Sequence, residues 1–182
     1  MPKSLADGHM KFTILTEKPE DPKAPTASEL NEGLDFSCDV LSSDFSWTAA
    51  DSDKLAEKAL CSSNNANALG ASNFSAGITV FRYFDDETGQ PDETEDAKFA
   101  AVQEKGTTVW GYLRKTGQEY DEDWADDDEI ALGMEVITDT PQQPSDQGGY
   151  IKYRIPMEPQ RGYPFIKVGG GGSTPPPDTE PG

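Results

Sequence analysis

The sequence holds few of the residues that enzymes use for acid–base and nucleophilic chemistry. It has one histidine and two cysteines in 182 residues. His9 stands near the N-terminus in a segment without hydrophobic periodicity, so no Ser–His–Asp or Cys–His set can be built around it. Two cysteines and one histidine also fall short of the four ligands of a structural zinc site. We therefore predict no catalytic residue, no metal site and no cofactor.

Long apolar runs and basic residues are also scarce. No stretch approaches the roughly 18 apolar residues that span a bilayer, and the start does not resemble a signal peptide. The sequence has 15 basic against 34 acidic residues, a formal net charge of −19. This balance argues against binding of nucleic acid or of an anionic membrane, because both need a basic face. We expect no membrane partner and a protein that is either made and used in the cytosol or carried out by a route other than secretion.

The two cysteines, Cys38 and Cys61, are too few for a disulfide framework. One bridge between them is compatible with the sequence, but a cytosolic setting favours two reduced, buried thiols. The hydrophobic fraction is 34% and the mean hydropathy −0.70, both low for a compact globular protein. Either part of the chain is unstructured, or partners complete its apolar surface.

The clearest local signals lie between residues 71 and 115, where the pattern predicts a strand, a helix and a second strand. A β-branched and aromatic run at 78–84 marks the first strand. Asp92 or Thr94 can cap the helix, and Gly106 can supply the left-handed residue that ends it. A helix this short is marginal alone, so we expect it to pack on the flanking strands.

Alternating apolar and polar residues predict most of the remaining structure as strands. These strands are expected at 10–16, 34–48 (a strand pair or one long bent strand), 129–139, 150–157 and 162–168. Loops are expected at 17–33, 62–72, 116–128 and 141–149, and a short helix at 51–61. The predicted fold is mainly β, with two packed antiparallel sheets in a sandwich or barrel and one flanking α-helix.

The domain organisation expected from this pattern is simple. Residues 1–9 form an N-terminal arm, and residues 10–168 form one β domain that contains an extended Pro-rich loop at 17–33. Residues 169–182 are GGGG followed by a Pro-rich acidic segment, which is typical of a flexible tail.

Two acidic clusters, 85–96 and 119–129, contain 15 of the 34 acidic residues and no basic residue. Such clusters are either solvated loops or a calcium site, because calcium is coordinated by several carboxylate oxygens. Neither cluster fits the helix–loop–helix spacing, since a loop that starts at Asp121 has Asp126 where glycine is required. We interpret both clusters as solvated loops.

Basic residues gather elsewhere, with Lys152, Arg154, Arg161 and Lys167 against Glu158 alone between 149 and 168. A molecule with acidic loops at one end and basic strands elsewhere is suited to meet its own copies head to tail. An ordinary surface with a dipole explains the pattern equally well, and the sequence leaves both readings open.

Four stretches resemble the major tail (tail tube) proteins of long-tailed bacteriophages, especially those that infect actinobacteria. They are SSDFSWTAADSD at 42–53, ASNFSAGITVFRYFD at 71–85, KGTTVWGYLRKTGQ at 105–118 and ITDTPQQPSDQGGYIKYRIPM at 137–157. The resemblance covers roughly residues 10–168, in the order of the family.

The resemblance implies a structural virion protein without catalytic residues, made of two antiparallel sheets beside one helix. Members of the family form hexameric rings that stack head to tail into the tube through which the genome leaves the capsid. The expected partners are copies of the chain itself, a tape measure protein, a tail terminator and distal tail proteins. Phage DNA would pass through without specific binding, and assembly would take place in the host cytoplasm.

A tail tube subunit needs a face toward the lumen and surfaces that contact neighbouring subunits, and we assign candidate residues to both. The longest polar face on a predicted strand pair is the candidate lumen face, which comprises Asp35, Ser37, Asp39, Asp44 and Ser46. The candidate contacts between subunits are Asp85, Asp86, Glu87, Asp126, Asp127, Asp128, Lys152, Arg154 and Arg161, together with the segments 1–9 and 17–33. If charge drives ring stacking, assembly should weaken toward about 1 M salt, whereas salt-indifferent tubes would indicate apolar stacking.

A second reading is a monomeric β-sandwich that binds a carbohydrate or a protein ligand. It predicts a pocket with clustered, exposed aromatic side chains, and Trp47, Trp110 and Trp124 are the first candidates for its lining.

Overall fold

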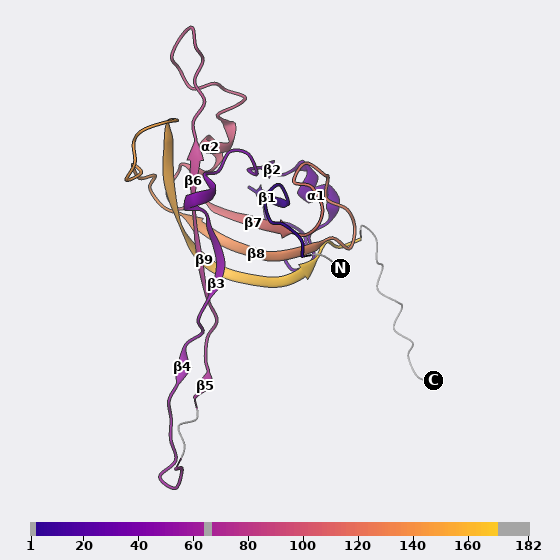
Figure 1. Ribbon diagram of the computed structural model, residues 1–182, viewed down its shortest axis with the longest axis vertical. Helices are drawn as coiled ribbons and strands as arrows, with labels where there is room; N and C mark the ends of the chain where they lie inside the picture. The colour runs from indigo at the N-terminus through magenta and orange to yellow at the C-terminus, as the bar shows by residue number, and fades with distance from the viewer. Residues whose placement is uncertain (1–2, 64–66, 171–182) are drawn as a thin grey trace.

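The computed structural model describes residues 3–63 and 67–170. Its main feature is a seven-stranded antiparallel sheet in the order β2-β1-β7-β8-β9-β6-β3 (Figure 1). The strands are β1 (Met10–Leu15), β2 (Leu34–Asp35), β3 (Ser46–Ala50), β6 (Asn73–Phe81), β7 (Thr108–Lys115), β8 (Glu129–Thr138) and β9 (Lys152–Lys167). A small two-stranded sheet pairs β4 (Lys54–Leu55) with β5 (Ala68–Leu69). The helices are α1 (Ala27–Glu32), α2 (Ala97–Val102) and the 3₁₀ helix η1 (Ser42–Asp44).

The large sheet curls until its two ends face each other. β1 and β3 are separated by four strands in the sheet, yet the rings of Phe12 and Trp47 lie 4.8 Å apart. The Trp47 indole N–H also donates a 3.1 Å hydrogen bond to the carbonyl of Leu132 in β8. The mainly β prediction is confirmed, and the two expected layers are the two halves of one continuous sheet.

The main core fills the inside of this curl. It includes side chains from β1, β3, β6, β7, β8 and β9, and α2 closes it with Phe99 and Val102. Gly111 lies directly under Trp47, where an added Cβ would come within 2.5 Å of the indole ring. A side chain at this position would therefore push the two halves of the sheet apart.

A second cluster covers the outer face of β1, β7 and β8. It joins Leu30 of α1 to Trp110, Tyr112 and Trp124, so β7 is buried on both faces. α1 lies in the segment 17–33, which was predicted to be a loop. Its start carries a capping box, in which Thr26 and Glu29 each bond the backbone N–H of the other. The T-x-x-E spacing was the signal that could have located this helix.

The strand prediction at 34–48 was wrong in its middle. The carboxylate of Asp35 accepts a 2.9 Å hydrogen bond from the Ser37 backbone N–H, and this turn ends β2 after two residues. Phe36 turns into the core, and Cys38 is exposed. Cys61 is exposed as well, so the expectation of two buried thiols was also wrong, although both thiols are free.

The short helix predicted at 51–61 is absent. Residues 54–55 form β4 instead, because the hydrogen-bonded ladder of β3 and β6 continues outward beyond the sheet. A helix here would have carried an apolar stripe of Leu55 and Ala59 with no core within reach to cover it.

The helix predicted near 94–105 exists as α2 but ends at Val102. The Asp92 carboxylate accepts bonds from the N–H groups of Thr94 and Glu95, one turn before the helix begins. Gly106 has the predicted left-handed conformation, with φ at +88°, and leads into β7. The two last predicted strands, 150–157 and 162–168, form one continuous strand, β9.

Candidate assembly surfaces

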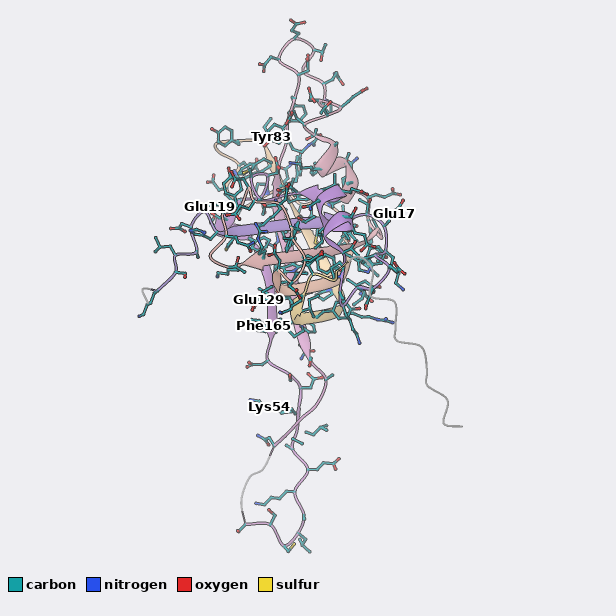
Figure 2. All side chains as sticks on the ribbon, turned by 90° about the vertical axis from the view of Figure 1, so that its right-hand side faces the viewer. Glu17, Lys54, Tyr83, Glu119, Glu129 and Phe165 are labelled. Carbon is teal, nitrogen blue, oxygen red and sulfur yellow. The ribbon has the colours of Figure 1, made fainter. Side chains whose placement is uncertain are left out.

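Two projections leave the sheet at the two ends of β6 (Figure 1). Before β6, residues 51–63 run out from the sheet and residues 67–72 run back to it, and these two segments are here named the hairpin arm. After β6, residues 85–96 form a second projection, here named the acidic loop. Figure 2 places Lys54 of the hairpin arm and Tyr83, at the base of the acidic loop, on opposite sides of the sheet.

The hairpin arm is held by backbone hydrogen bonds and by almost no packing. Asp53 donates its N–H to Ala71 at 2.9 Å and accepts from Gly70 at 2.7 Å. Its leucines nevertheless lie in solvent, with Leu55 exposed by 56%, Leu69 by 76% and Leu60 fully. A two-stranded ribbon of this kind is marginal in water, and its exposed leucines make the hairpin arm a candidate interaction surface.

The base of the acidic loop is fixed by a buried ion pair. The guanidinium of Arg82 donates three hydrogen bonds of 2.7–3.0 Å to the Asp96 carboxylate, which also accepts the Tyr83 N–H at 3.0 Å. The same guanidinium lies 4.0 Å from the centre of the Phe99 ring. These contacts fix where the loop leaves the sheet, so its acidic tip is presented in one direction.

A second buried carboxylate ties the loop to the 34–48 segment. Asp39 accepts a 2.7 Å hydrogen bond from the Tyr83 hydroxyl and forms an ion pair with Lys98. The hydrogen bond to this carboxylate, together with burial, raises the pKa of Tyr83 to about 12. Asp39 is 6% exposed, so its charge is compensated mainly by these contacts inside the molecule.

The predicted contact residues at the acidic-loop end of β6 include both acidic and basic side chains. Asp85, Asp86 and Glu87 are exposed, and hydrogen bonds from the Thr88 hydroxyl and backbone N–H hold the pKa of Asp85 below its usual range. Lys152 pairs with Phe81 in the β6–β9 ladder and therefore lies at the same end. The basic residues at the start of β9 thus lie beside the acidic loop of their own chain.

Arg154 is also engaged within the chain. Its guanidinium donates to Asp44 at 2.6 Å, and the same carboxylate accepts from the Thr79 hydroxyl at 2.5 Å. Arg161, farther along β9, is exposed and forms no ion pair in the part of the chain that the structure describes.

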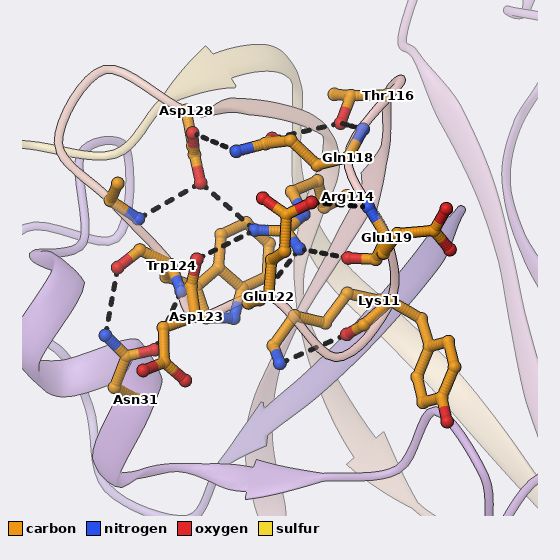
Figure 3. Close-up of polar contacts among 12 residues, drawn as sticks. Lys11, Asn31, Arg114, Thr116, Gln118, Glu119, Glu122, Asp123, Trp124 and Asp128 are labelled. Carbon is orange, nitrogen blue, oxygen red and sulfur yellow. Dashed lines mark hydrogen bonds and ion pairs between the residues drawn. The ribbon is translucent and has the colours of Figure 1, made fainter. Parts of the chain in front are cut away.

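The second acidic segment, 119–128, is wrapped around an arginine (Figure 3). The fully buried Arg114 donates hydrogen bonds of 2.8–3.1 Å to the carbonyls of Glu119, Glu122 and Asp123. It also forms a 3.1 Å ion pair with Asp128. The loop therefore presents its oxygen atoms to an internal guanidinium. Within residues 3–63 and 67–170, no three His, Cys, Asp or Glu side chains are arranged to hold a metal ion.

Tertiary contacts fix the position of this segment. Trp124 is buried, donates its indole N–H to the Thr13 hydroxyl at 2.9 Å, and is bracketed by both ends of the Asn31 amide. Asp128 is therefore a structural residue, whereas Asp126 and Asp127 are exposed. Asp127 lies 4.0 Å from Lys167. These carboxylates are far along the chain and the sheet from the acidic loop.

The five candidate lumen residues do not share one strand face. Asp35 and Ser37 lie beside β1, where the Asp35 carboxylate is 3.1 Å from the Lys11 ammonium. Asp44 is in η1, and Ser46 is in β3, 2.9 Å from Ser75. Their role toward the lumen stays a prediction.

The connection between β8 and β9, residues 139–151, forms a hollow beside the acidic loop. It encloses about 170 Å³ and is lined by Pro144, Gln147, Tyr150 and Ile151 among others. Tyr150 is 81% exposed and packs edge to face on Phe81, with ring centres 5.9 Å apart. Lys152 holds the connection closed by donating to the Gly148 carbonyl at 2.8 Å.

The tryptophans do not form an exposed aromatic site. Trp47, Trp110 and Trp124 are 5%, 8% and 3% exposed, and all three belong to the two cores. The prediction that these three tryptophans line the exposed pocket of a carbohydrate- or protein-binding module was therefore wrong. In the described ranges, no helix is long and apolar enough to cross a membrane.

Sequence reasoning missed the hairpin arm. The signal for it was three isolated leucines in an otherwise polar stretch between two strands that pair with each other. It also missed the hollow, since residues 141–149 were interpreted only as a connection.

The comparison with curated proteins finds no match. The model of the family described as phage tail tube protein matches residues 1–168, which include the curled sheet, both projections and the Arg114 loop. The chain therefore belongs to the phage tail tube protein family.

Proposed function

We propose that the chain assembles into hexameric rings that stack head to tail into the phage tail tube, through which DNA leaves the capsid. The observation that carries this proposal is the incompleteness of the single subunit. It exposes leucines on a hairpin arm at one end of β6 and an acidic loop beside a hollow at the other. Heterologous contacts of this kind generate an extended stack. Family membership supports the same conclusion.

The conduit is negatively charged in this proposal. Each copy has a formal charge of −19, and a wall of that sign lets a DNA strand slide past because it repels the phosphates. Asp35, Ser37, Asp39, Asp44 and Ser46 stay our candidates for the lumen side. The three carboxylates of this set are each offset by a cation of the same chain, Asp35 by Lys11, Asp39 by Lys98 and Asp44 by Arg154.

The exposed acidic residues Asp85, Asp86, Glu87, Asp126 and Asp127 are proposed to contact neighbouring copies, together with Lys152, Arg154 and Arg161. Asp128 is not itself a contact residue in this proposal. Its ion pair with the buried Arg114 holds in place the loop that carries Asp126 and Asp127. The partners at the two ends of the tube are a tail terminator and distal tail proteins, with a tape measure protein inside. The tube is built in the host cytoplasm and becomes part of the virion, as in the actinobacteriophage members that the sequence resembles.

Negative-stain electron microscopy of the purified protein tests this proposal. Tubes, or rings with six-fold symmetry, are the expected result. A monomer that persists at every concentration and salt condition would contradict it.

A further inference from the structure

A polar hollow of about 550 Å³ lies between the segment around η1 and the connection between β8 and β9. Both walls carry groups that form hydrogen bonds, and these include Ser43, Gln143, Ser145 and Asp146. The volume falls in the range of about 300–1,000 Å³ that is common for pockets of small ligands. The hollow of about 170 Å³ beside Tyr150 adjoins it, since Gln143, Pro144 and Lys152 line both.

An ordered ion pair lines the larger hollow. Arg154 donates to the Asp44 carboxylate at 2.6 Å, and the second oxygen of this carboxylate accepts from the hydroxyl of the buried Thr79 at 2.5 Å. The guanidinium lies over Gly77, where an added Cβ would come to 3.3 Å from Nη2. The side chains of Arg154 and Asp44 are still 38% and 41% exposed. The pair is therefore fixed in position and presents both N–H donors and acceptor oxygens to the hollow.

The connection that forms the opposite wall is fixed to the start of β9. Gln142 and Arg154 exchange backbone N–H···O bonds of 2.7 and 2.9 Å. Lys152 donates to the Gly148 carbonyl at 2.8 Å, and the Asp146 carboxylate accepts the Gly148 N–H at 2.9 Å. The polar groups of this wall are thus in place before a ligand arrives, which lowers the entropy cost of binding.

The formal charges that line the larger hollow cancel. Lys152 and Arg154 contribute two positive charges, and Asp44 and Asp146 contribute two negative ones. A phosphate or another anion would meet both carboxylates there, and the net charge of −19 on the chain repels it further. Donors and acceptors without net charge instead match an uncharged ligand that carries many hydroxyl groups.

The smaller hollow adds an apolar surface. Tyr150 is 81% exposed, and its ring is held edge to face against Phe81 with 5.9 Å between the ring centres. Pro144 and Ile151 belong to the same lining. A sugar ring has apolar C–H faces and a rim of hydroxyl groups, so it can stack on a tyrosine while its rim forms hydrogen bonds.

We propose that the two hollows together bind an uncharged oligosaccharide. One sugar ring stacks on Tyr150, and the next forms hydrogen bonds with Gln143 and Asp146 in the larger hollow. This inference goes beyond the proposed function and does not rest on it, since one subunit contains every residue of the site. Lys152 and Arg154 are also among the proposed contacts between copies, so the site is open on subunits without a neighbour on this side.

Ligand-observed NMR of the full chain, kept below the concentration at which it assembles, tests the site. The probes are maltose, cellobiose, lactose, mannobiose and chitobiose, with inorganic phosphate as the anionic alternative. We expect saturation transfer to at least one disaccharide, with a Kd that changes less than about two-fold between low and about 1 M salt. Absence of binding to every disaccharide, or binding of phosphate alone, would overturn the inference. Electron micrographs decide the proposed function separately, so either can fail alone.

Two matched double variants locate the binding. Gln143→Ala/Asp146→Ala removes an amide and a carboxyl from the wall of the hollow. Gln160→Ala/Glu158→Ala removes the same two groups from exposed positions farther along β9. We expect about ten-fold weaker binding from the first variant and unchanged binding from the second, with melting temperatures close to that of the unmodified chain. Equal affinity of the two variants would overturn the site.

Substitutions of Tyr150 test the stacking. Tyr150→Phe keeps the ring and should bind the disaccharide as the unmodified chain does. Tyr150→Ala removes the ring from an exposed position and should weaken binding about ten-fold. Unchanged binding by Tyr150→Ala would overturn the placement of a sugar ring on this side chain.

Discussion

At the scale of single residues, Arg114 shows how an acidic loop is held without a metal ion. Its guanidinium donates hydrogen bonds to three backbone carbonyls and to the Asp128 carboxylate inside the protein. The sequence showed the excess of carboxylates but not the cation, because the arginine is on β7 and reaches the loop only after folding. Its partners are carbonyls, which any residue type supplies, so no side-chain pattern could reveal them.

We predict that Arg114→Met lowers the free energy of unfolding by about 3–5 kcal/mol, since it leaves Asp128 and the carbonyls buried without a partner. Chemical denaturation measures this change. Lys115→Met, at the exposed next residue, is the control and should stay within about 0.5 kcal/mol of the unmodified chain. Equal stability of the two variants would show that the loop is held by other contacts.

Tyr83 gives a prediction that depends on pH. Its pKa is raised from 10.0 to about 12, mainly because the phenol O–H donates to the Asp39 carboxylate. The stabilisation is therefore complete below pH 10 and is lost as the pH rises through 12. Tyr83→Phe should cost about 1 kcal/mol at neutral pH, and this difference should vanish above the folded pKa. Thermal melts across that range, with Tyr150→Phe as control, measure it; a difference that is independent of pH would contradict it.

At the scale of elements, strands with a buried core face were predictable, and segments fixed by contacts outside the core were not. β1, β7 and β8 follow their alternating or apolar patterns closely, since burial selects their residues. The hairpin arm has no core contact, so its sequence carries no periodicity that could distinguish a ribbon from a helix. The candidate assembly surfaces were predictable as charge clusters, but their placement depends on the β6–β9 register.

Removal of the hairpin arm separates folding from assembly. We predict that replacing residues 54–69 by a short Asn-Gly turn changes the free energy of unfolding by less than about 1 kcal/mol, because residues 54–63 and 67–69, the part that the structure describes, pack on no core residue. The same variant should form no tubes. Denaturation curves and electron micrographs of one preparation measure both outcomes, and tubes of normal length from this variant would contradict the role given to the arm.

At the scale of the whole molecule, charge opposes assembly more than it drives it. Each copy carries a formal charge of −19, and several cations, among them Lys11, Arg82, Arg114 and Arg154, are already paired within the chain. Copies brought together therefore repel each other, and apolar docking has to overcome this repulsion. This differs from stacking driven by complementary charge, which was one expectation from the sequence.

We accordingly predict that assembly strengthens as salt is raised. The Debye length falls from about 10 Å at 0.1 M salt to about 3 Å at 1 M, which screens the repulsion between copies. Light scattering at a fixed protein concentration should rise over this range. A steady loss of scattering toward 1 M salt would instead indicate that ion pairs between copies hold the tube.

Electron cryo-microscopy of the assembled protein tests the central claim most directly. The account predicts a hollow tube of stacked six-membered rings, in which the exposed leucines of the hairpin arm, Leu55, Leu60 and Leu69, are covered by a neighbouring copy. Particles that remain monomeric under all assembly conditions would contradict the claim that this chain builds a tube.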